Sequence, residues 1–243
     1  MQQIARRRTL TDDVYDALRR QIVTLDLLPG AALVDKDLSE QFGVSRTPLR
    51  EAILRLVQDG LVIVAPQYAT FVAPLNPVAV REAHFLRENL ELPVLRQLCG
   101  GASIDLSGPH QILIEQRLLL NRGTFADFLP LDDRFHQLLF QLAGLDKIWN
   151  IIHAKKAQLD RVRHIQAPQD GKIRTLIEEH TAILAAIAAQ DSTTAETVLR
   201  RHISGAVGYL GQLAAERPEL FALPEGRGRT AAEKSHRTRK AMP

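Results

Sequence analysis

The stretch Leu33-Val-Asp-Lys-Asp-Leu-Ser-Glu-Gln-Phe-Gly-Val-Ser-Arg-Thr-Pro-Leu-Arg-Glu-Ala-Ile53 decides how the N-terminal part of this chain folds. Apolar residues one turn apart indicate a short helix over residues 36–42. Gly43 then supplies a turn, and Ser45 is a favourable N-cap for a second helix that accommodates Pro48 in its first turn. The pattern predicts a helix-turn-helix, a motif that places its second helix in the major groove of DNA.

The residues on either side of this stretch complete a domain. Apolar residues at three- and four-residue spacing predict a further helix over residues 11–25. Downstream, β-prone runs at 61–65 and 70–73 flank a turn and predict a hairpin. Three helices followed by a hairpin form a winged helix-turn-helix, which we assign to residues 1–75.

The rest of the chain has helical periodicity and no strand pattern. Gly and Pro interruptions divide residues 76–215 into six predicted helices: 78–98, 105–121, 124–142, 146–166, 172–189 and 193–213. Residues 216–243 are charged, contain Gly and Pro and have little to bury, which predicts a disordered basic tail. The expected fold class is mainly α, with a winged helix-turn-helix before an all-helical bundle for metal and ligand binding and for dimerisation.

The charge of the chain is unevenly placed. Its 243 residues carry 31 Lys and Arg against 28 Asp and Glu, a formal net charge of +3. Acidic and basic side chains balance within 1–75 and within 76–215, so the excess lies in the tail and nucleic-acid binding depends on local placement. The single Cys99 excludes an intrachain disulfide, and we find no signal peptide or membrane-spanning run. These features predict a cytoplasmic protein with no membrane partner.

Arg46 and Arg50 lie one turn apart on the second helix of the motif, so both project from one side. A guanidinium fork fits guanine O6 and N7 or a phosphate, and hydroxyl groups at a helix start bind phosphate oxygens. The expected DNA contacts are Lys36, Ser45, Arg46, Thr47, Arg50 and, at the tip of the wing, Gln67. The alternative interpretation, a cap residue and solvated surface charges, is disfavoured by the surrounding helices and wing.

Four possible metal ligands lie on helix faces that otherwise point to a core. Asp132 and His136 are four residues apart and share one helix face, while His180 and His202 each lie within an apolar stripe. Three histidines and one carboxylate suit zinc, nickel or another first-row divalent ion, with open positions for water or a ligand. A buried histidine is more often satisfied by hydrogen bonds, and the residues alone leave that alternative open.

The segment 33–72 resembles the DNA-binding domain of GntR-family transcription regulators, above all in the run Arg46-Thr-Pro-Leu-Arg-Glu-Ala52. The resemblance implies that the following residues occupy family positions that contact DNA: Lys36, Ser45, Arg46, Thr47 and Arg50. Many relatives carry Arg-Gly in the wing where this chain has Tyr68-Ala69, so the resemblance does not extend to a minor-groove contact there.

The helical half resembles the FCD ligand-binding domain of the FadR-type branch of that family, in its six-helix, VanR-like arrangement. The matching motifs are Arg87-Glu-Asn-Leu-Glu91, Asp132-Asp-Arg-Phe-His136, Glu179-His180 and Arg201-His202. The resemblance implies metal ligation by Asp132, His136, His180 and His202, with Asp133 as second choice. The implied metal is zinc, or nickel or manganese in its place, and it binds the carboxylate of a small organic acid. The implied carboxylate clamp is completed by Arg87 and by Arg161, or by Arg163 in its place.

Together these expectations describe a ligand-responsive transcription regulator, a repressor that binds a palindromic operator on double-stranded DNA as a homodimer. A small carboxylate effector, such as a sugar acid or other hydroxy acid, binds beside the metal and releases the DNA. Two alternatives stay open. A metal with an open position also activates water, as in a hydrolase or lyase fused to a DNA-binding domain. In the other, the helical half serves only to dimerise a constitutive DNA-binding protein.

Overall fold

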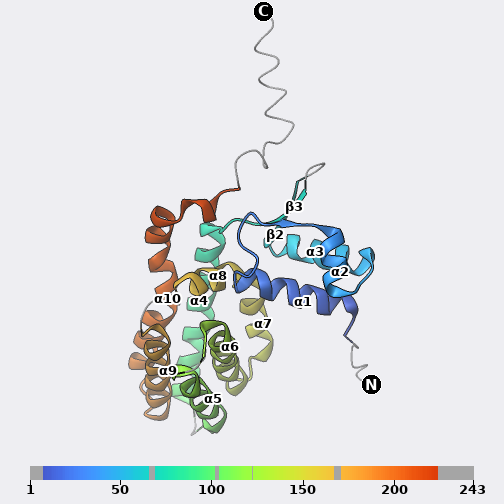
Figure 1. The fold of residues 1–243 in the computed structure, drawn as a ribbon. Helices are drawn as coiled ribbons and strands as arrows, with labels where there is room; N and C mark the ends of the chain where they lie inside the picture. The colour runs from blue at the N-terminus through green and yellow to red at the C-terminus, as the bar shows by residue number, and fades with distance from the viewer. Residues whose placement is uncertain (1–7, 66–68, 102–103, 122, 167–170, 224–243) are drawn as a thin grey trace, which may run out of the picture. The chain divides into compact units, whose positions relative to one another are not determined.

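The computed structural model describes residues 8–65, 69–101, 104–121, 123–166 and 171–223. The chain divides into two compact units. The first unit contains residues 1–75 together with 213–243, and the second contains residues 76–212. Helices dominate both units, and a small sheet belongs to the first, as the mainly α prediction requires (Figure 1).

Three helices and three strands form the first unit: α1 (Leu10–Val23), α2 (Asp35–Phe42), α3 (Arg46–Gln58), β1 (Ala32–Leu33), β2 (Val62–Ala65) and β3 (Ala69–Val72). The strands pair antiparallel in the order β1-β3-β2, with Ile63 opposite Phe71 across the hairpin. Leu18 on α1 and Leu49 on α3 are fully buried where these helices pack together. The winged helix-turn-helix prediction is confirmed, and the two-residue β1 is an addition that a pattern of period two cannot reveal.

Local sequence explains where these helices begin and end. Thr9 and Asp12 form a reciprocal capping box at the start of α1. Gly43 ends α2 with φ of 62°, a left-handed conformation that glycine adopts without strain. Ser45 is the N-cap of α3 by position, but its side chain makes no cap hydrogen bond, which leaves the hydroxyl exposed.

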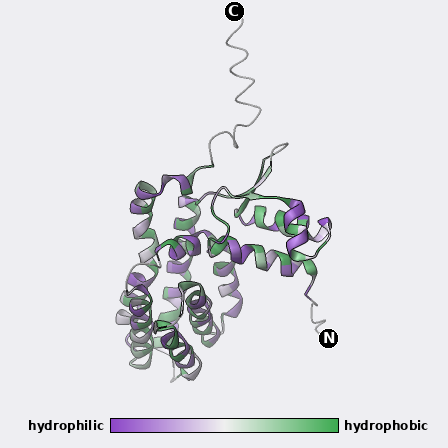
Figure 2. Cartoon of the chain, in the orientation of Figure 1, coloured by the Kyte–Doolittle hydropathy of each residue, from purple (hydrophilic) through white to green (hydrophobic). Residues whose placement is uncertain are grey.

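The second unit is an all-helical bundle. Its elements are α4 (Pro77–Gly100), α5 (Ser107–Leu118), the 3-10 turn η1 (Leu119–Asn121), α6 (Phe125–Leu142), α7 (Asp146–Lys155), α8 (Ala157–Gln166), α9 (Lys172–Ala188) and α10 (Ser192–Glu216), whose last residues belong to the first unit. Hydrophobic and hydrophilic residues alternate around these helices, as amphipathic packing requires (Figure 2).

The single helix predicted over residues 146–166 is wrong. The structure divides it at Lys156 into α7 and α8, so the described part of the second unit holds seven α-helices and not six. Lys156 is almost fully buried, and its ammonium pairs with Asp133 at 2.8 Å and with Asp160 at 2.5 Å. Apolar periodicity continues through the break, which is why the pattern conceals it.

The expectation that disorder begins at residue 216 is also wrong for the first residues of the tail. A 3-10 turn, η2 (Pro218–Phe221), follows α10. Leu220 is buried in it, and its carbonyl oxygen accepts a hydrogen bond of 2.8 Å from the Leu75 amide. The burial of a single leucine holds this turn. A prediction of disorder from the average composition of the tail does not detect one such residue. Residues 224–243 lie outside the described ranges.

None of the helices within the described ranges combines the length and the apolar character that a membrane span requires. Cys99 is buried and has a free thiol.

Candidate metal centre and nucleic-acid interface

Four side chains from three helices meet in the interior of the second unit. α6 supplies Asp132 and His136, α9 supplies His180, and α10 supplies His202. All four are buried, and one ligand atom from each lies within 4.8 Å of the others. The sequence predicted these residues on the buried faces of three separate helices. The structure brings those three faces together.

The histidine nitrogens are spaced as ligands of one ion would be. His202 Nε2 lies 3.1 Å from His136 Nε2 and 3.3 Å from His180 Nε2. Two nitrogens at about 2.0–2.1 Å from one zinc ion are roughly 2.9 Å apart at a right angle and roughly 3.3 Å apart at a tetrahedral angle. The observed distances fall within this range.

The other ring nitrogen of each histidine lies near a side-chain oxygen. His180 Nδ1 is hydrogen-bonded to Gln116 Oε1 at 2.9 Å, and His202 Nδ1 to Glu179 Oε2 at 3.1 Å. His136 Nδ1 lies 2.9 Å from Glu91 Oε2 without forming a hydrogen bond, while its Nε2 lies 3.0 Å from the donor Arg87 Nη2. An acceptor at Nδ1, or a donor at Nε2, favours the proton on Nδ1 and leaves the Nε2 lone pair free for a metal.

Burial favours the neutral form of two of the histidines. It lowers the pKa of His180 well below the usual value and also lowers the pKa of His202, because an imidazolium is poorly solvated there. Burial alone would raise the pKa of Asp132, but the positive charge of Arg163 holds it well below its usual range. Neutral imidazoles beside an ionised carboxylate are the protonation states in which these groups bind metals.

Asp132 also carries a buried oxygen that nothing satisfies. Its Oδ1 has no hydrogen-bond partner among the described residues and lies 3.5 Å from His180 Nε2 and 3.8 Å from His202 Nε2. Leaving a buried acceptor unpaired costs about 1–3 kcal/mol, and more when it is charged. A cation among these atoms would remove that cost, so the residues fit a divalent metal.

Two arginines border the cluster. Arg87 donates from Nε to Glu91 Oε1 at 2.6 Å, and its Nη2 lies 3.0 Å from His136 Nε2. Arg163 donates from Nη2 to Asp132 Oδ2 at 2.8 Å. Both guanidinium groups are buried beside these carboxylates. Their positive charges keep the carboxylates ionised.

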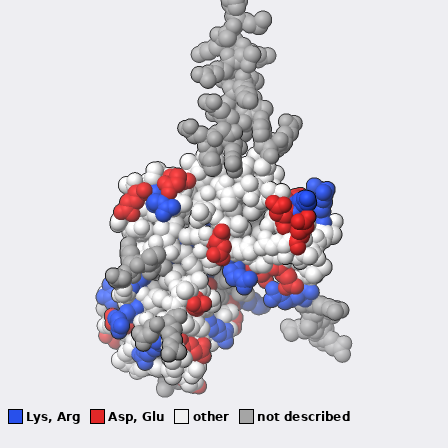
Figure 3. Space-filling view, in the orientation of Figure 1, with Lys and Arg blue, Asp and Glu red and all other residues white. Residues whose placement is uncertain are grey.

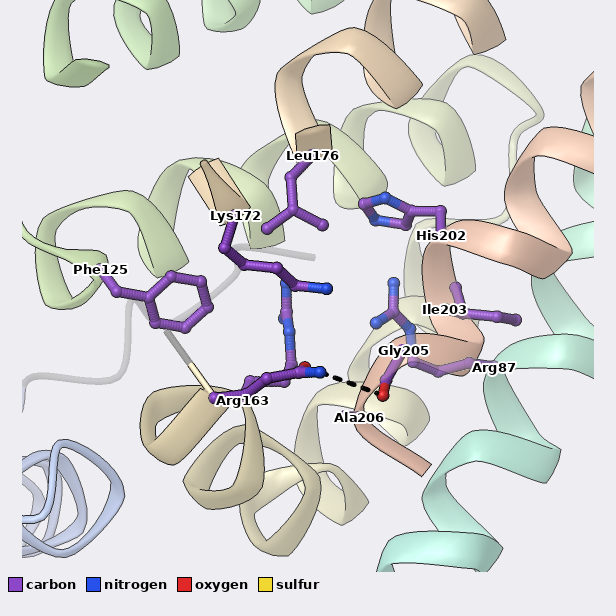
Figure 4. Close-up of a pocket in the computed structure, with 10 residues that line it drawn as sticks. Arg87, Phe125, Arg163, Lys172, Leu176, His202, Ile203, Gly205 and Ala206 are labelled. Atoms are coloured by element: carbon purple, nitrogen blue, oxygen red, sulfur yellow. Dashed lines mark hydrogen bonds between the residues drawn. The ribbon is translucent and has the colours of Figure 1, made fainter. Parts of the chain in front are cut away.

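A small pocket, partly open to solvent, adjoins the cluster and is reached by both arginines. Arg87, Arg163 and Lys172 extend toward it from different helices, and His202 forms part of its wall (Figure 4). Phe125 and Leu176 supply apolar surface. Charged groups around a small concave site are typical of a site for a small anion.

Arg161 does not lie where we expected the second arginine of the carboxylate clamp. It is fully buried, donates to Gln158 Oε1 at 3.1 Å and is absent from the pocket lining, whereas Arg163 is part of it. Two residues along a helix differ by about 200° in direction, so only one of this pair can face the cluster. Asp133, the second-choice ligand, pairs with Lys156.

Sequence reasoning did not assign roles to the residues behind the ligands. Glu91 and Glu179 lay within quoted motifs but had no assigned function, and nothing in the sequence marks Gln116 as the partner of His180. A signal existed only for the glutamates, which are charged residues on otherwise apolar helix faces.

The predicted DNA-contacting side chains gather at the start of α3. Ser45, Arg46, Thr47 and Arg50 are all exposed. Arg50 Nε lies 3.5 Å from Asp35 Oδ2, and the Lys36 ammonium lies 4.0 Å from Glu40. Both are exposed ion pairs, which contribute little net energy to folding. Gln67 lies outside the described residues.

The visible surface has no single basic patch. Acidic and basic side chains are interspersed over the face shown in Figure 3. This agrees with the equal numbers of acidic and basic residues in 1–75.

Comparison with known proteins gives matches over both units. Residues 10–72 match the family of bacterial regulatory proteins, gntR family, and residues 82–205 match the FCD domain.

Relatives match over nearly the whole chain. An "Uncharacterized HTH-type transcriptional regulator in unstable DNA locus" of Streptomyces ambofaciens is 36% identical over 219 residues, which cover 88% of this chain and 91% of the relative. The HTH-type transcriptional repressor RspR of Escherichia coli (strain K12) is 32% identical over 216 residues, covering 88% of this chain and 94% of the repressor. The solved structure of E. coli McbR/YncC superposes with a TM-score of 0.71 at 26% identity, over 85% of this chain and 99% of that one.

Proposed function

Because the chain belongs to the gntR family of bacterial regulatory proteins and carries an FCD domain, we propose that it is a repressor whose affinity for DNA is controlled by a metal-bound organic acid. That it is a DNA-binding transcription regulator follows from the family. The repressor role is supported by its likeness to the repressor RspR. It acts in the cytoplasm, where chromosomal DNA is accessible.

DNA binding in this proposal starts from α3. Arg46 and Arg50 read base edges or phosphates in the major groove, while Ser45 and Thr47 hold the backbone at the positive end of the helix dipole. A homodimer places two such helices on a palindromic operator, since two-fold protein symmetry matches two-fold DNA symmetry. The support is the shared exposure of these side chains at one helix end.

Asp132, His136, His180 and His202 would hold the metal, with zinc as first choice and nickel or manganese as alternatives. When bound, the ion supplies a Lewis-acidic position for a carboxylate oxygen. The single observation that carries this proposal is that the three Nε2 atoms converge while each Nδ1 lies within 3.1 Å of a side-chain oxygen.

Arg87 and Arg163 would orient the acid. Arg87 Nη2 now contacts the His136 Nε2 lone pair, which a metal would use instead. Its release would direct a guanidinium edge to the pocket, where it can pair with a carboxylate. The alternative of a metal-dependent hydrolase or lyase has no support, because both matching families and the relatives are transcription regulators.

The test measures metal content and DNA binding together. Purified full-length protein should hold about one equivalent of divalent metal per chain by elemental analysis. His180→Ala and His202→Ala should lose it, whereas His153→Ala, a change at an exposed histidine, should not. Wild-type protein without stoichiometric metal, even after zinc, nickel and manganese are supplied, would contradict the proposal.

A further inference from the structure

A third cation lines the pocket beside the two arginines. Lys172 is the first residue of α9, and its side chain extends into the pocket lined by Arg163 and His202 (Figure 4). Burial lowers its pKa. Within the described ranges Lys172 forms no ion pair, unlike Arg87 and Arg163.

Two of the three cations that line the pocket are already paired with carboxylates. Arg87 pairs with Glu91, and Arg163 pairs with Asp132 and Asp160. Among the described lining residues, Lys172 is therefore the cation whose charge an incoming anion can neutralise without breaking an ion pair.

The α10 backbone leaves room for the lysine. A Cβ added at Gly205 would lie 3.0 Å from the Lys172 ammonium nitrogen, closer than a relaxed contact allows. Gly205 lies in the interior of α10, where glycine is less favourable to a helix than alanine. The missing side chain thus opens the wall of the pocket at the charged end of Lys172.

From this geometry we infer that the effector is a small dicarboxylate and that Lys172 binds its second acid group. The inference rests on the proposed function: the first carboxylate lies at the metal beside Arg87 and Arg163. Lys172 is then a specificity-determining residue, since it meets the part of the acid that a monocarboxylate lacks.

The test compares acids that differ only in the second acid group. Calorimetry on zinc- or nickel-loaded full-length protein would use malate against 2-hydroxybutyrate, and 2-hydroxyglutarate against 2-hydroxypentanoate. The diacid of at least one pair should bind about tenfold or more tightly, since a hydrogen bond to a charged group is worth about 1.5–3 kcal/mol. Gluconate tests whether hydroxyl groups replace the second acid.

Substitutions test which side chain binds the second acid group. Lys172→Met should weaken diacid binding about tenfold and change monoacid binding less than about threefold. Arg174→Met, which removes an exposed charge two residues away on α9, should change neither. Gly205→Ala should keep or raise the melting temperature, because alanine favours a helix more than glycine does. It should reduce the preference for the diacid, because the added Cβ crowds the Lys172 ammonium.

Equal affinity within each pair, or gluconate binding tighter than every diacid, would overturn the inference and leave the proposed function standing. Equal losses of mono- and diacid binding in Lys172→Met would also overturn it. Failure of every acid to bind metal-loaded protein would overturn both.

Discussion

At the scale of single residues, the metal centre depends on which ring nitrogen of each histidine carries the proton. Gln116 and Glu179 are hydrogen-bonded to Nδ1 of His180 and His202, and Glu91 lies 2.9 Å from Nδ1 of His136, an arrangement that favours free lone pairs on the three Nε2 atoms. None of these three residues would itself touch the metal. They favour the protonation states in which the three Nε2 atoms can bind one metal ion.

Removing one of these supports should weaken metal binding. Glu179→Ala frees His202 to adopt the other tautomer, and loss of such a support costs about 10- to 100-fold in metal affinity. Competition with a chelating dye measures the affinity. The matched control is Glu178→Ala, an exposed glutamate one position earlier on α9. Equal metal affinities in the two variants would contradict the role given to Glu179.

The buried histidines also set how the metal-free protein responds to acid. The pKa values of His180 and His202 are lowered in the folded state, so below the unfolded value of 6.5 the unfolded chain binds more protons. Stability should therefore fall as the pH falls from about 7.5 to about 5.5, by at most about 1.4 kcal/mol per pH unit for each proton.

Denaturant unfolding of chelator-treated protein across this range measures the slope. His153→Gln, at an exposed position, is the control and should leave the slope unchanged. Stability that is constant or rises toward acid pH would show that these histidines are not kept neutral by burial.

At the scale of elements, apolar periodicity predicted most helices, because each buries one continuous stripe. It could not predict the break between α7 and α8, since the break is stabilised by the buried ammonium of Lys156 and its two carboxylates. Nor could periodicity predict that Arg163, and not Arg161, contacts Asp132, because this depends on how α8 is rotated against α6. The ligand set was found because each member is a polar residue on an apolar face.

Exposed arginines at the start of α3 should contribute to DNA affinity but not to the stability of the fold. Arg46→Ala and Arg50→Ala should each weaken operator binding by about 1–3 kcal/mol, the value of a bidentate base contact. Both side chains are exposed, so the melting temperature should not change. Fluorescence anisotropy with promoter DNA measures the affinity, and Arg20→Ala on α1 is the exposed control. Affinities within about twofold of wild type would contradict the assignment of α3 as the recognition helix.

The turn η2 should stabilise the first unit. Leu220→Ala removes a buried side chain and should lower the free energy of unfolding of that unit by about 2–3 kcal/mol. Glu219→Ala, next to it and exposed, should have little effect. Chemical denaturation monitored by circular dichroism compares the two. Equal stabilities would show that the segment after α10 does not belong to the folded unit.

At the scale of the whole molecule, two covalent connections join the units. The chain enters the second unit between Leu75 and Asn76, just before α4, and leaves it within α10 between Gln212 and Leu213. α4, which begins just after the first connection, carries Arg87, and α10, which spans the second connection, carries the metal-ligand candidate His202. A ligand that favours one arrangement of these helices by about 1–3 kcal/mol would change operator affinity by the same amount.

The most direct measurement is operator binding by metal-loaded protein, followed by fluorescence anisotropy while organic acids are added. We expect at least one acid to raise the operator Kd by about fivefold or more, and we expect this response to vanish after metal removal and in His202→Ala. An operator Kd that no acid changes would contradict a metal-dependent acid sensor. So would an identical response in the metal-free protein.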